Sequence, residues 1–259
     1  MREIFTMWSN TRMVVLTALT AALYAALIIP FKPIPIIPGF TEIRPAVAVP
    51  LVFGVLFGPA AAWGSGLGNV IGDFFGGTLG LGSVFGFFGN FFFALTPYKL
   101  LGSLTDEAAK IPGWRGTAGF LSAAVLASAV CAATVAWGTD SFGLVPFTAL
   151  GSIIFVNNLL VGVFLGPVLL RLVRPRVASW HLIWTDIMDV TPVSPLRHRI
   201  GAACMWAGGI GALAVGIALS MGLYGGELFQ FGAGEKAGVG VALGVPPFLI
   251  LFIVGCILA

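Results

Sequence analysis

Apolar residues occur along this chain in long windows, and charged or turn-forming residues separate each window from the next. Because a bilayer core of about 30 Å requires about 20 apolar residues per helix, each window predicts a helix that crosses a membrane. Eight windows are expected to form such helices, and the third is short and glycine-rich, so that it could span only half of the bilayer. Their residues are 13–30, 46–63, 64–78, 82–101, 117–137, 146–172, 201–223 and 239–259.

Composition agrees with this pattern and defines the fold class. Hydrophobic residues make up 58% of the 259 residues and charged residues only 9%, whereas about a quarter of the residues in a soluble domain are charged. The apolar runs are continuous and lack the alternation that the strands of a membrane barrel show. We therefore expect an all-α integral membrane protein, whose first helix is retained because no clear signal-peptide cleavage site follows it.

The most polar stretch of the chain, at residues 173–200, separates two groups of helices. We expect residues 1–172 to form a membrane domain of six helices and residues 201–259 to add two transmembrane helices. The stretch between them is predicted to be a cytoplasmic linker, either solvated or lying along the membrane as an interfacial segment. Its prolines argue against one continuous helix; they are Pro175, Pro192 and Pro195.

The distribution of basic residues predicts the orientation of the helices. In the eight-helix arrangement, all lysines and arginines fall on one side of the membrane except Lys32, Arg44 and Lys236. Since loops rich in lysine and arginine stay in the cytoplasm, both termini are expected there, together with residues 102–116 and 173–200. The segments expected to face outward are 31–45, 138–145 and 224–238. No basic run carries interleaved aromatic residues, so we expect no nucleic-acid partner.

Small residues recur at every fourth position in several predicted helices, most clearly in "WGSGLGNVIGDFFGG" at 63–77. In lipid, this spacing allows two helix backbones to approach closely. The stretch therefore predicts a packing ridge that consists of Gly64, Gly68, Gly72 and Gly76. The first helix carries a comparable stripe, which is expected either to pack internally or to contact a separate membrane subunit. That stripe consists of Ala18, Ala22 and Ala26.

One carboxylate lies well inside a predicted span. Asp73 follows Asn69 by one helical turn on the same face. An ionisable side chain at membrane depth costs a few kcal/mol, so it is expected to face the interior of the bundle or a cavity that holds water. The pair therefore predicts an internal polar network, and two interpretations stay open: a network that only holds helices together, and a site that binds a ligand.

Further polar side chains predict a pocket near these positions. Asn90, Asn157 and Asn158 lie midway along predicted helices, and each amide can both donate and accept hydrogen bonds. Phenylalanines surround them in sequence and would suit a flat aromatic or heterocyclic ligand, although such side chains usually meet lipid or core. The proline-rich outer loop "FKPIPIIPGFTEIRP" is expected to be extended and to place Glu42 and Arg44 at the entrance.

The chemistry of an enzyme is missing from the predicted spans. Both histidines, His181 and His198, fall in the polar stretch, so neither a metal site nor a catalytic triad is expected within the membrane. The three cysteines are isolated and predict no disulfide framework. No phosphate-binding loop of the GxxxxGK[ST] type is present, which excludes an ATPase of that kind. We expect no enzyme and no cofactor.

The block from Ala18 to Asn90 resembles the substrate-binding S component of energy-coupling factor (ECF) transporters, the vitamin-uptake systems of prokaryotes. The resemblance rests on an alanine-rich first helix, an outer loop and "RPAVAVPLVFGVLFGPAAAWGSGLGNVIGDFFGG", in which "LFGP" and "GN..GD" within 56–73 are the most telling parts. It implies a prokaryotic plasma-membrane protein with six helices and cytoplasmic termini. The two helices at 201–259 depart from this pattern.

The resemblance also implies partners and a site. The alanine stripe would dock on a transmembrane coupling subunit that two ATPase subunits energise. The substrate, a vitamin-like micronutrient, would bind near the outer face. The positions that correspond to that site are Glu42, Arg44, Asn90, Trp137, Asn157 and Asn158.

We thus expect a membrane subunit that binds a micronutrient for uptake powered by a separate ATPase module. Two other functions agree with the same residues. The first is a secondary transporter that uses Asp73 as a proton site and needs no ATPase. The second is a structural or assembly protein whose glycine ridges hold a larger membrane complex together.

Overall fold

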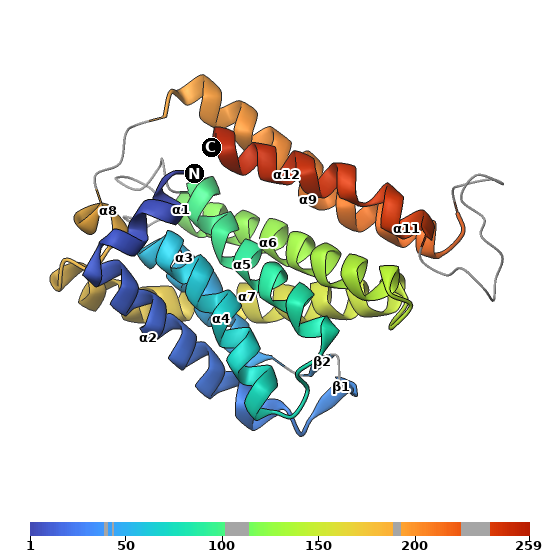
Figure 1. Ribbon diagram of the computed structural model, residues 1–259. Helices are drawn as coiled ribbons and strands as arrows, with labels where there is room; N and C mark the ends of the chain where they lie inside the picture. The colour runs from blue at the N-terminus through green and yellow to red at the C-terminus, as the bar shows by residue number, and fades with distance from the viewer. Residues whose placement is uncertain (39–40, 43, 102–113, 189–192, 224–238) are drawn as a thin grey trace.

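The computed structural model describes residues 1–38, 41–42, 44–101, 114–188, 193–223 and 239–259, and helices dominate it (Figure 1). Six of its helical segments are long and apolar enough to cross a membrane, and the shorter apolar helix at residues 45–57 lies among them. This confirms an all-α membrane protein with several spans. The main helices are α2 (Thr11–Ile28), α3 (Ala48–Phe57), α4 (Pro59–Phe75), α5 (Leu81–Leu101), α6 (Trp114–Ser141), α7 (Phe147–Ser179), α9 (Pro195–Ser220), α11 (Val239–Gly244) and α12 (Pro246–Leu258).

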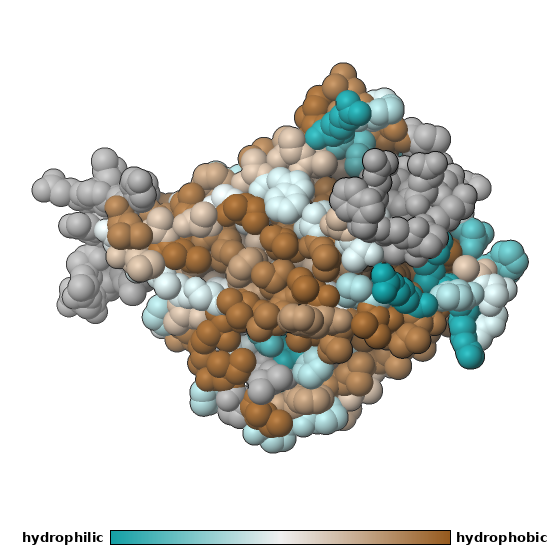
Figure 2. Space-filling model, turned by 180° about the vertical axis from the view of Figure 1, so that it is seen from behind, coloured by the Kyte–Doolittle hydropathy of each residue, from teal (hydrophilic) through white to brown (hydrophobic). Residues whose placement is uncertain are grey.

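Short elements close the two ends of the bundle. At one end lie α1 (Glu3–Thr6) and α8 (Trp184–Ile187), and at the other lies an antiparallel hairpin of β1 (Pro35–Ile37) and β2 (Thr41–Glu42) (Figure 1). Three short 3₁₀ turns complete the described elements: Met7–Ser9, Ile29–Phe31 and Pro45–Val47. The surface between the ends is largely apolar, and hydrophilic residues gather toward one end (Figure 2). This distribution is what a bilayer around the middle of the bundle requires.

Helix α3 lies at the centre of the bundle. All ten of its residues are buried, and it packs against α2, α4, α5 and α7. The sequence "AVPLVFGVLF" is apolar on every side and would suit lipid as well as a core, so the contacts with its four neighbours define its central position.

The division between the second and third predicted helices differs from the sequence-based expectation. The break lies at Gly58 and not between Trp63 and Gly64. Gly58 has a φ of +55°, in the left-handed region that glycine adopts without strain, and Pro59 starts α4. The pair Gly58-Pro59 is therefore the boundary signal in the sequence, and the glycine-rich helix is longer than its predicted window.

The predicted glycine ridge forms the contact between α4 and α2. A Cβ atom at Gly64 would lie 2.6 Å from Thr20 Cβ, and one at Gly68 would lie 2.8 Å from the carbonyl oxygen of Ala21. At Gly72 the nearest side chain is that of Ile28 of α2, and at Gly76 it is that of Lys32, which follows the 3₁₀ turn after α2. The ridge is thus a packing device, because only hydrogen atoms fit between the two backbones.

The alanine stripe on α2 points away from this contact. Ala18, Ala22 and Ala26 are exposed, whereas Ala21 and Ala25 are buried. The stripe does not pack internally within the described part of the chain. Apolar side chains flank it and are exposed as well: Val15, Leu19, Leu23 and Leu27.

The two C-terminal spans pack on the bundle on the side away from α2. Helix α9 packs along α12 and contacts α6 and α7, and Figure 1 shows this pair and α2 at opposite sides, with α4, α5 and α6 between them. Gly209 brings α9 close to Leu126 of α6, and Gly216 brings it close to Phe147 of α7. The extra helices therefore leave the exposed face of α2 open.

The polar stretch at 173–200 contains more helix than its prolines suggested. Helix α7 continues through Pro175 to Ser179, and α9 begins at Pro195, where proline is favoured because the first helical N–H needs no partner. Between them, within the described residues, only the four-residue α8 is helical, so that no long interfacial helix forms. Trp184 of α8 is buried against Tyr98, with ring centroids 4.9 Å apart. The predicted loops at 102–113 and 224–238 lie outside the described residues.

Candidate functional site

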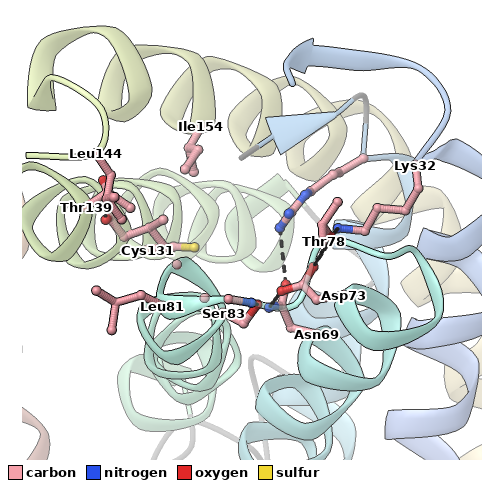
Figure 3. A pocket seen from close by; sticks show the side chains of 15 residues that line it. Lys32, Asn69, Asp73, Thr78, Leu81, Ser83, Cys131, Thr139, Leu144 and Ile154 are labelled. Carbon is pink, nitrogen blue, oxygen red and sulfur yellow. Dashed lines mark hydrogen bonds and ion pairs between the residues drawn. The ribbon is translucent and has the colours of Figure 1, made fainter. Parts of the chain in front are cut away.

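A cavity of about 230 Å³ lies at the end of the bundle that carries the hairpin (Figure 3). Its walls come from the end of α2, from α4, α5, α6 and α7, and from the loops between them. The lining residues are Lys32, Arg44, Asn69, Asp73, Thr78, Gly80, Leu81, Gly82, Ser83, Gly86, Cys131, Val135, Thr139, Leu144 and Ile154. One wall is polar and charged, and the other is apolar. This combination is typical of a site that binds a small molecule.

Asp73 is the centre of the polar wall. Lys32 Nζ lies 2.5 Å from Asp73 Oδ1 and 3.1 Å from the hydroxyl oxygen of Thr78. On the other side, Asn69 Nδ2 donates a hydrogen bond of 3.0 Å to Asp73 Oδ2. The side chains of Lys32 and Asp73 are only 7% and 9% exposed, so the pair is shielded from water. A buried carboxylate is thus paired with a cation and hydrogen bonded, which membrane depth requires.

Asn69 connects this ion pair to the rest of the cavity. Its Oδ1 accepts hydrogen bonds from Arg44 Nη1 at 3.3 Å and from Asn90 Nδ2 at 3.0 Å. Gly86 allows this arrangement, since a Cβ atom there would lie 2.6 Å from Asn69 Nδ2. The amide of Asn69 therefore has a single orientation, with its oxygen toward Arg44 and its NH₂ group toward Asp73.

Tyr24 of α2 completes the network behind the cavity. Its hydroxyl donates a hydrogen bond of 2.6 Å to Asn90 Oδ1, and Asn90 Nδ2 also donates to the carbonyl oxygen of Gly86 at 2.8 Å. Tyr24 and Asn90 are 0% and 1% exposed. The donors thus run in one direction, from Tyr24 through Asn90 and Asn69 to the carboxylate of Asp73.

Phenylalanine at position 24 is expected to lower the stability of the protein. Tyr24→Phe leaves Asn90 Oδ1 buried without the donor described above, which costs about 1–3 kcal/mol. Thermal unfolding of the detergent-purified chain measures the change. Tyr98→Phe is the matched control, because its buried ring packs against Trp184 and no described hydrogen bond involves its hydroxyl. An equal loss in both variants would contradict a specific role for the Tyr24 hydroxyl.

The sequence-predicted residues divide into three groups. Arg44, Asn69 and Asp73 line the cavity, and Asn69 and Asp73 form the predicted internal network. Asn90 and Asn158 are buried behind it, Asn90 through Asn69 and Asn158 within hydrogen-bonding reach of the Cys131 thiol. These positions support the prediction of a polar pocket, although the amides of α5 and α7 lie one layer behind its surface.

The other predicted residues lie elsewhere. Trp137 Nε1 donates a hydrogen bond of 3.2 Å to the carbonyl oxygen of Ala242, so this side chain contacts the C-terminal helices. Asn157 is partly buried and is not among the lining residues. Glu42 belongs to β2, two residues before the cavity-lining Arg44 in the sequence, and its side chain lies outside the described part of the structure.

Sequence reasoning missed Lys32, the ion-pair partner of Asp73. The available signal was its position two residues beyond the end of the first predicted span, together with a side chain long enough to reach a neighbouring helix. The phenylalanines near Asn90 were weighed as a stacking surface, but no aromatic side chain is among the described lining residues. The apolar wall consists of aliphatic side chains and Cys131 instead.

The cavity is built for hydrogen bonding to a small polar molecule. Within the described residues, no group of three or more histidine, cysteine, aspartate or glutamate side chains is placed to hold a metal ion. Donors on Lys32, Arg44 and Asn69 lie within a few ångströms of one carboxylate, that of Asp73. Such a set recognises a ligand that presents both donors and acceptors on one edge.

Comparisons with known proteins give one result. The family described as QueT transporter matches residues 14–175, which include every described residue that lines the cavity. The comparisons with curated proteins and with solved structures gave no match.

Proposed function

Because this chain belongs to the QueT transporter family, we propose that it binds a precursor of queuosine in the cavity around Asp73. It is an S component of the ECF type, a membrane transporter subunit for a small molecule and not an enzyme. The observation that carries the proposal is the buried set of Lys32, Asp73, Asn69 and Arg44 in a cavity within the matched region.

The chemistry of the ligand suits this set. Queuosine precursors contain a 7-deazaguanine base, a flat bicycle whose one edge carries a ring N–H and an amino group beside a carbonyl oxygen. A carboxylate such as Asp73 accepts hydrogen bonds from the two donors, and Arg44 or Asn69 donate to the carbonyl. The cavity of about 230 Å³ is smaller than the roughly 300–1,000 Å³ of pockets for drug-sized ligands, which favours a single bicyclic base.

We further infer that the cavity faces the outside of a prokaryotic plasma membrane and that both termini are cytoplasmic. The cavity and the hairpin lie at one end of the bundle, and α1 and α8 lie at the other (Figure 1). The excess of basic residues in the segments at the latter end supports this orientation. A ligand then enters beside the hairpin and reaches Asp73 from outside.

Transport is powered by separate subunits that dock on α2. The exposed stripe of Ala18, Ala22 and Ala26 offers a surface on which another helix can pack at short distance. The partner is a transmembrane coupling subunit energised by two ATPase subunits. Helices α9 and α12 pack elsewhere and leave this stripe open.

The secondary transporter is the second candidate, and the ion pair disfavours it. A proton site must be open to a proton during transport, whereas both oxygens of Asp73 are occupied, Oδ1 by the Lys32 ammonium and Oδ2 by the amide of Asn69. Proton binding there would have to break a buried ion pair.

Mass spectrometry of small molecules released from the purified full-length chain tests the proposed function. After incubation with 7-deazaguanine bases, one stoichiometric compound is expected from the wild type and none from Asp73→Asn. Asp140→Asn is the control, because Asp140 is a buried carboxylate that does not line the cavity. No retained compound in the wild type would contradict the proposal and favour a structural role.

A further inference from the structure

Asp73 is held by three different kinds of donor, and one of them, Lys32, is a cation on a long flexible side chain. Asn69 lies one turn away on α4, and its amide is fixed by Arg44 and Asn90. Thr78 lies on the loop that follows α4, with its hydroxyl 3.4 Å from Asp73 Oδ1. Lys32 reaches the carboxylate from the turn after α2 through a flexible chain of four methylene groups.

The path of the Lys32 side chain is built into α4. Its stem crosses the end of that helix over Gly76, where a Cβ atom would lie 2.7 Å from Lys32 Cγ. The ammonium group then lies beside the C-terminal turn of α4, whose partial negative charge attracts cations. Glycine at position 76 thus clears a path to the one acceptor group in the polar wall that a base edge requires.

We infer that Lys32 is an internal competitor of the substrate for Asp73. The inference rests on the proposed function and adds a specificity device to it. The donor edge of the base takes the place of the Lys32 ammonium on Asp73 Oδ1, and the ammonium moves away from the ligand into water. A molecule without two adjacent donors cannot replace the ion pair that Asp73 loses when Lys32 leaves, so the site rejects it.

The exchange reaches the helix that carries the exposed alanine stripe. Polar contacts of Tyr24 with Asn90 and of Lys32 with Asp73 and Thr78 connect α2 and the turn after it to the cavity network. Substrate binding removes the contact of Lys32 with Asp73 and leaves that of Tyr24 with Asn90. The outer end of α2 is therefore held differently in the loaded and the unloaded protein, which makes the stripe sensitive to the state of the cavity.

The inference is tested by whether removal of the Lys32 charge raises or lowers the affinity for the ligand. Lys32→Met keeps most of the stem over Gly76 and removes the competing charge, so 7-aminomethyl-7-deazaguanine is expected to bind about fivefold more tightly, which corresponds to about 1 kcal/mol. Asp73→Asn is expected to weaken binding about 30-fold or more. Isothermal titration calorimetry of the full-length chain in lipid nanodiscs measures both values.

A second variant and a control guard against a folding defect. Gly76→Ala displaces the stem of Lys32 without changing any charge, and it is expected to tighten binding in the same direction as Lys32→Met. Lys99→Met is the matched control, because Lys99 is a buried lysine near a carboxylate, 3.8 Å from Glu3, and does not line the cavity. It is expected to leave the affinity unchanged.

The outcomes separate the inference from the proposed function. Tighter binding by Lys32→Met supports competition. Weaker or unchanged binding by a well-folded Lys32→Met, with a wild type that binds, overturns the inference and leaves the proposed function in place, since Lys32 would then be a direct contact or a bystander. A wild type that binds neither 7-deazaguanine nor its 7-aminomethyl derivative overturns both.

Discussion

Alanine at position 68 is expected to destabilise the protein, although alanine is the better helix former. The added Cβ of Gly68→Ala would lie 2.8 Å from the Ala21 carbonyl oxygen and 3.1 Å from Tyr24 Cβ, so α2 has to move away from α4. Overpacking of this kind costs about 1–3 kcal/mol. Thermal unfolding of the detergent-purified chain is the measurement, and a lower midpoint is expected.

A second glycine supplies the control with the opposite sign. At Gly119 of α6 the nearest side-chain atom to an added Cβ is Leu101 Cδ2 at 3.5 Å, an ordinary contact. Gly119→Ala therefore gains helix propensity of up to about 1 kcal/mol and raises the unfolding midpoint. If both variants shift the midpoint in the same direction, the ridge is not the close contact that the structure describes.

The consequences of Gly68→Ala extend to the cavity. A displaced α2 carries Tyr24 away from Asn90 and Lys32 away from Asp73, because both side chains belong to α2 or to the turn that follows it. Ligand affinity is thus expected to change together with stability. The glycine ridge and the carboxylate beside it serve one purpose, since the ridge sets the distance across which the polar contacts form.

Much of the fold follows from the hydrophobic pattern because the bilayer leaves few choices. Each predicted window is mostly helical in the described residues, although the second is interrupted at Gly58 and the last at Val245, and the ridge at Gly64 and Gly68 packs as its spacing predicted. The helix boundaries were harder to predict from the hydrophobic pattern. The break at Gly58 depends on one left-handed residue, and the continuation of α7 past Pro175 depends on how a long helix tolerates proline near its end.

The site was predicted in part, for reasons of the same kind. Asp73 and Asn69 share a helix face, so their network follows from spacing within one segment. Lys32 comes from the turn after α2, and its contact with Asp73 depends on how closely α2 and α4 pack, which a single segment does not reveal. Asn90 was expected to touch the ligand. Gly86 has no side chain, which leaves room for the Asn69 amide to lie between Asn90 and the cavity.

Tryptophan at position 22 is expected to abolish uptake while ligand binding persists. Ala22 lies in the middle of the exposed stripe of α2, away from the network behind the cavity, so a bulky side chain there meets only what packs on α2 from outside. A helix that approaches over small residues cannot accommodate an indole. Uptake of labelled 7-aminomethyl-7-deazaguanine, in cells that supply the coupling subunit and the ATPases, should fall at least about tenfold, which corresponds to about 1.4 kcal/mol of docking free energy.

The control variant changes a residue of α9, which lies on the opposite side of the bundle from α2 (Figure 1). Ala207 is also exposed, in the middle of α9, and Ala207→Trp adds the same indole to the membrane surface of the protein. Calorimetric affinities of both variants should match the wild type, because neither residue lines the cavity. Equal uptake by Ala22→Trp and wild type would show that the coupling subunit docks elsewhere, and loss of uptake in Ala207→Trp would shift the docking surface to α9. The expected result, loss in Ala22→Trp alone, assigns energy coupling to α2, the helix that also carries Tyr24 and leads into Lys32 at the cavity.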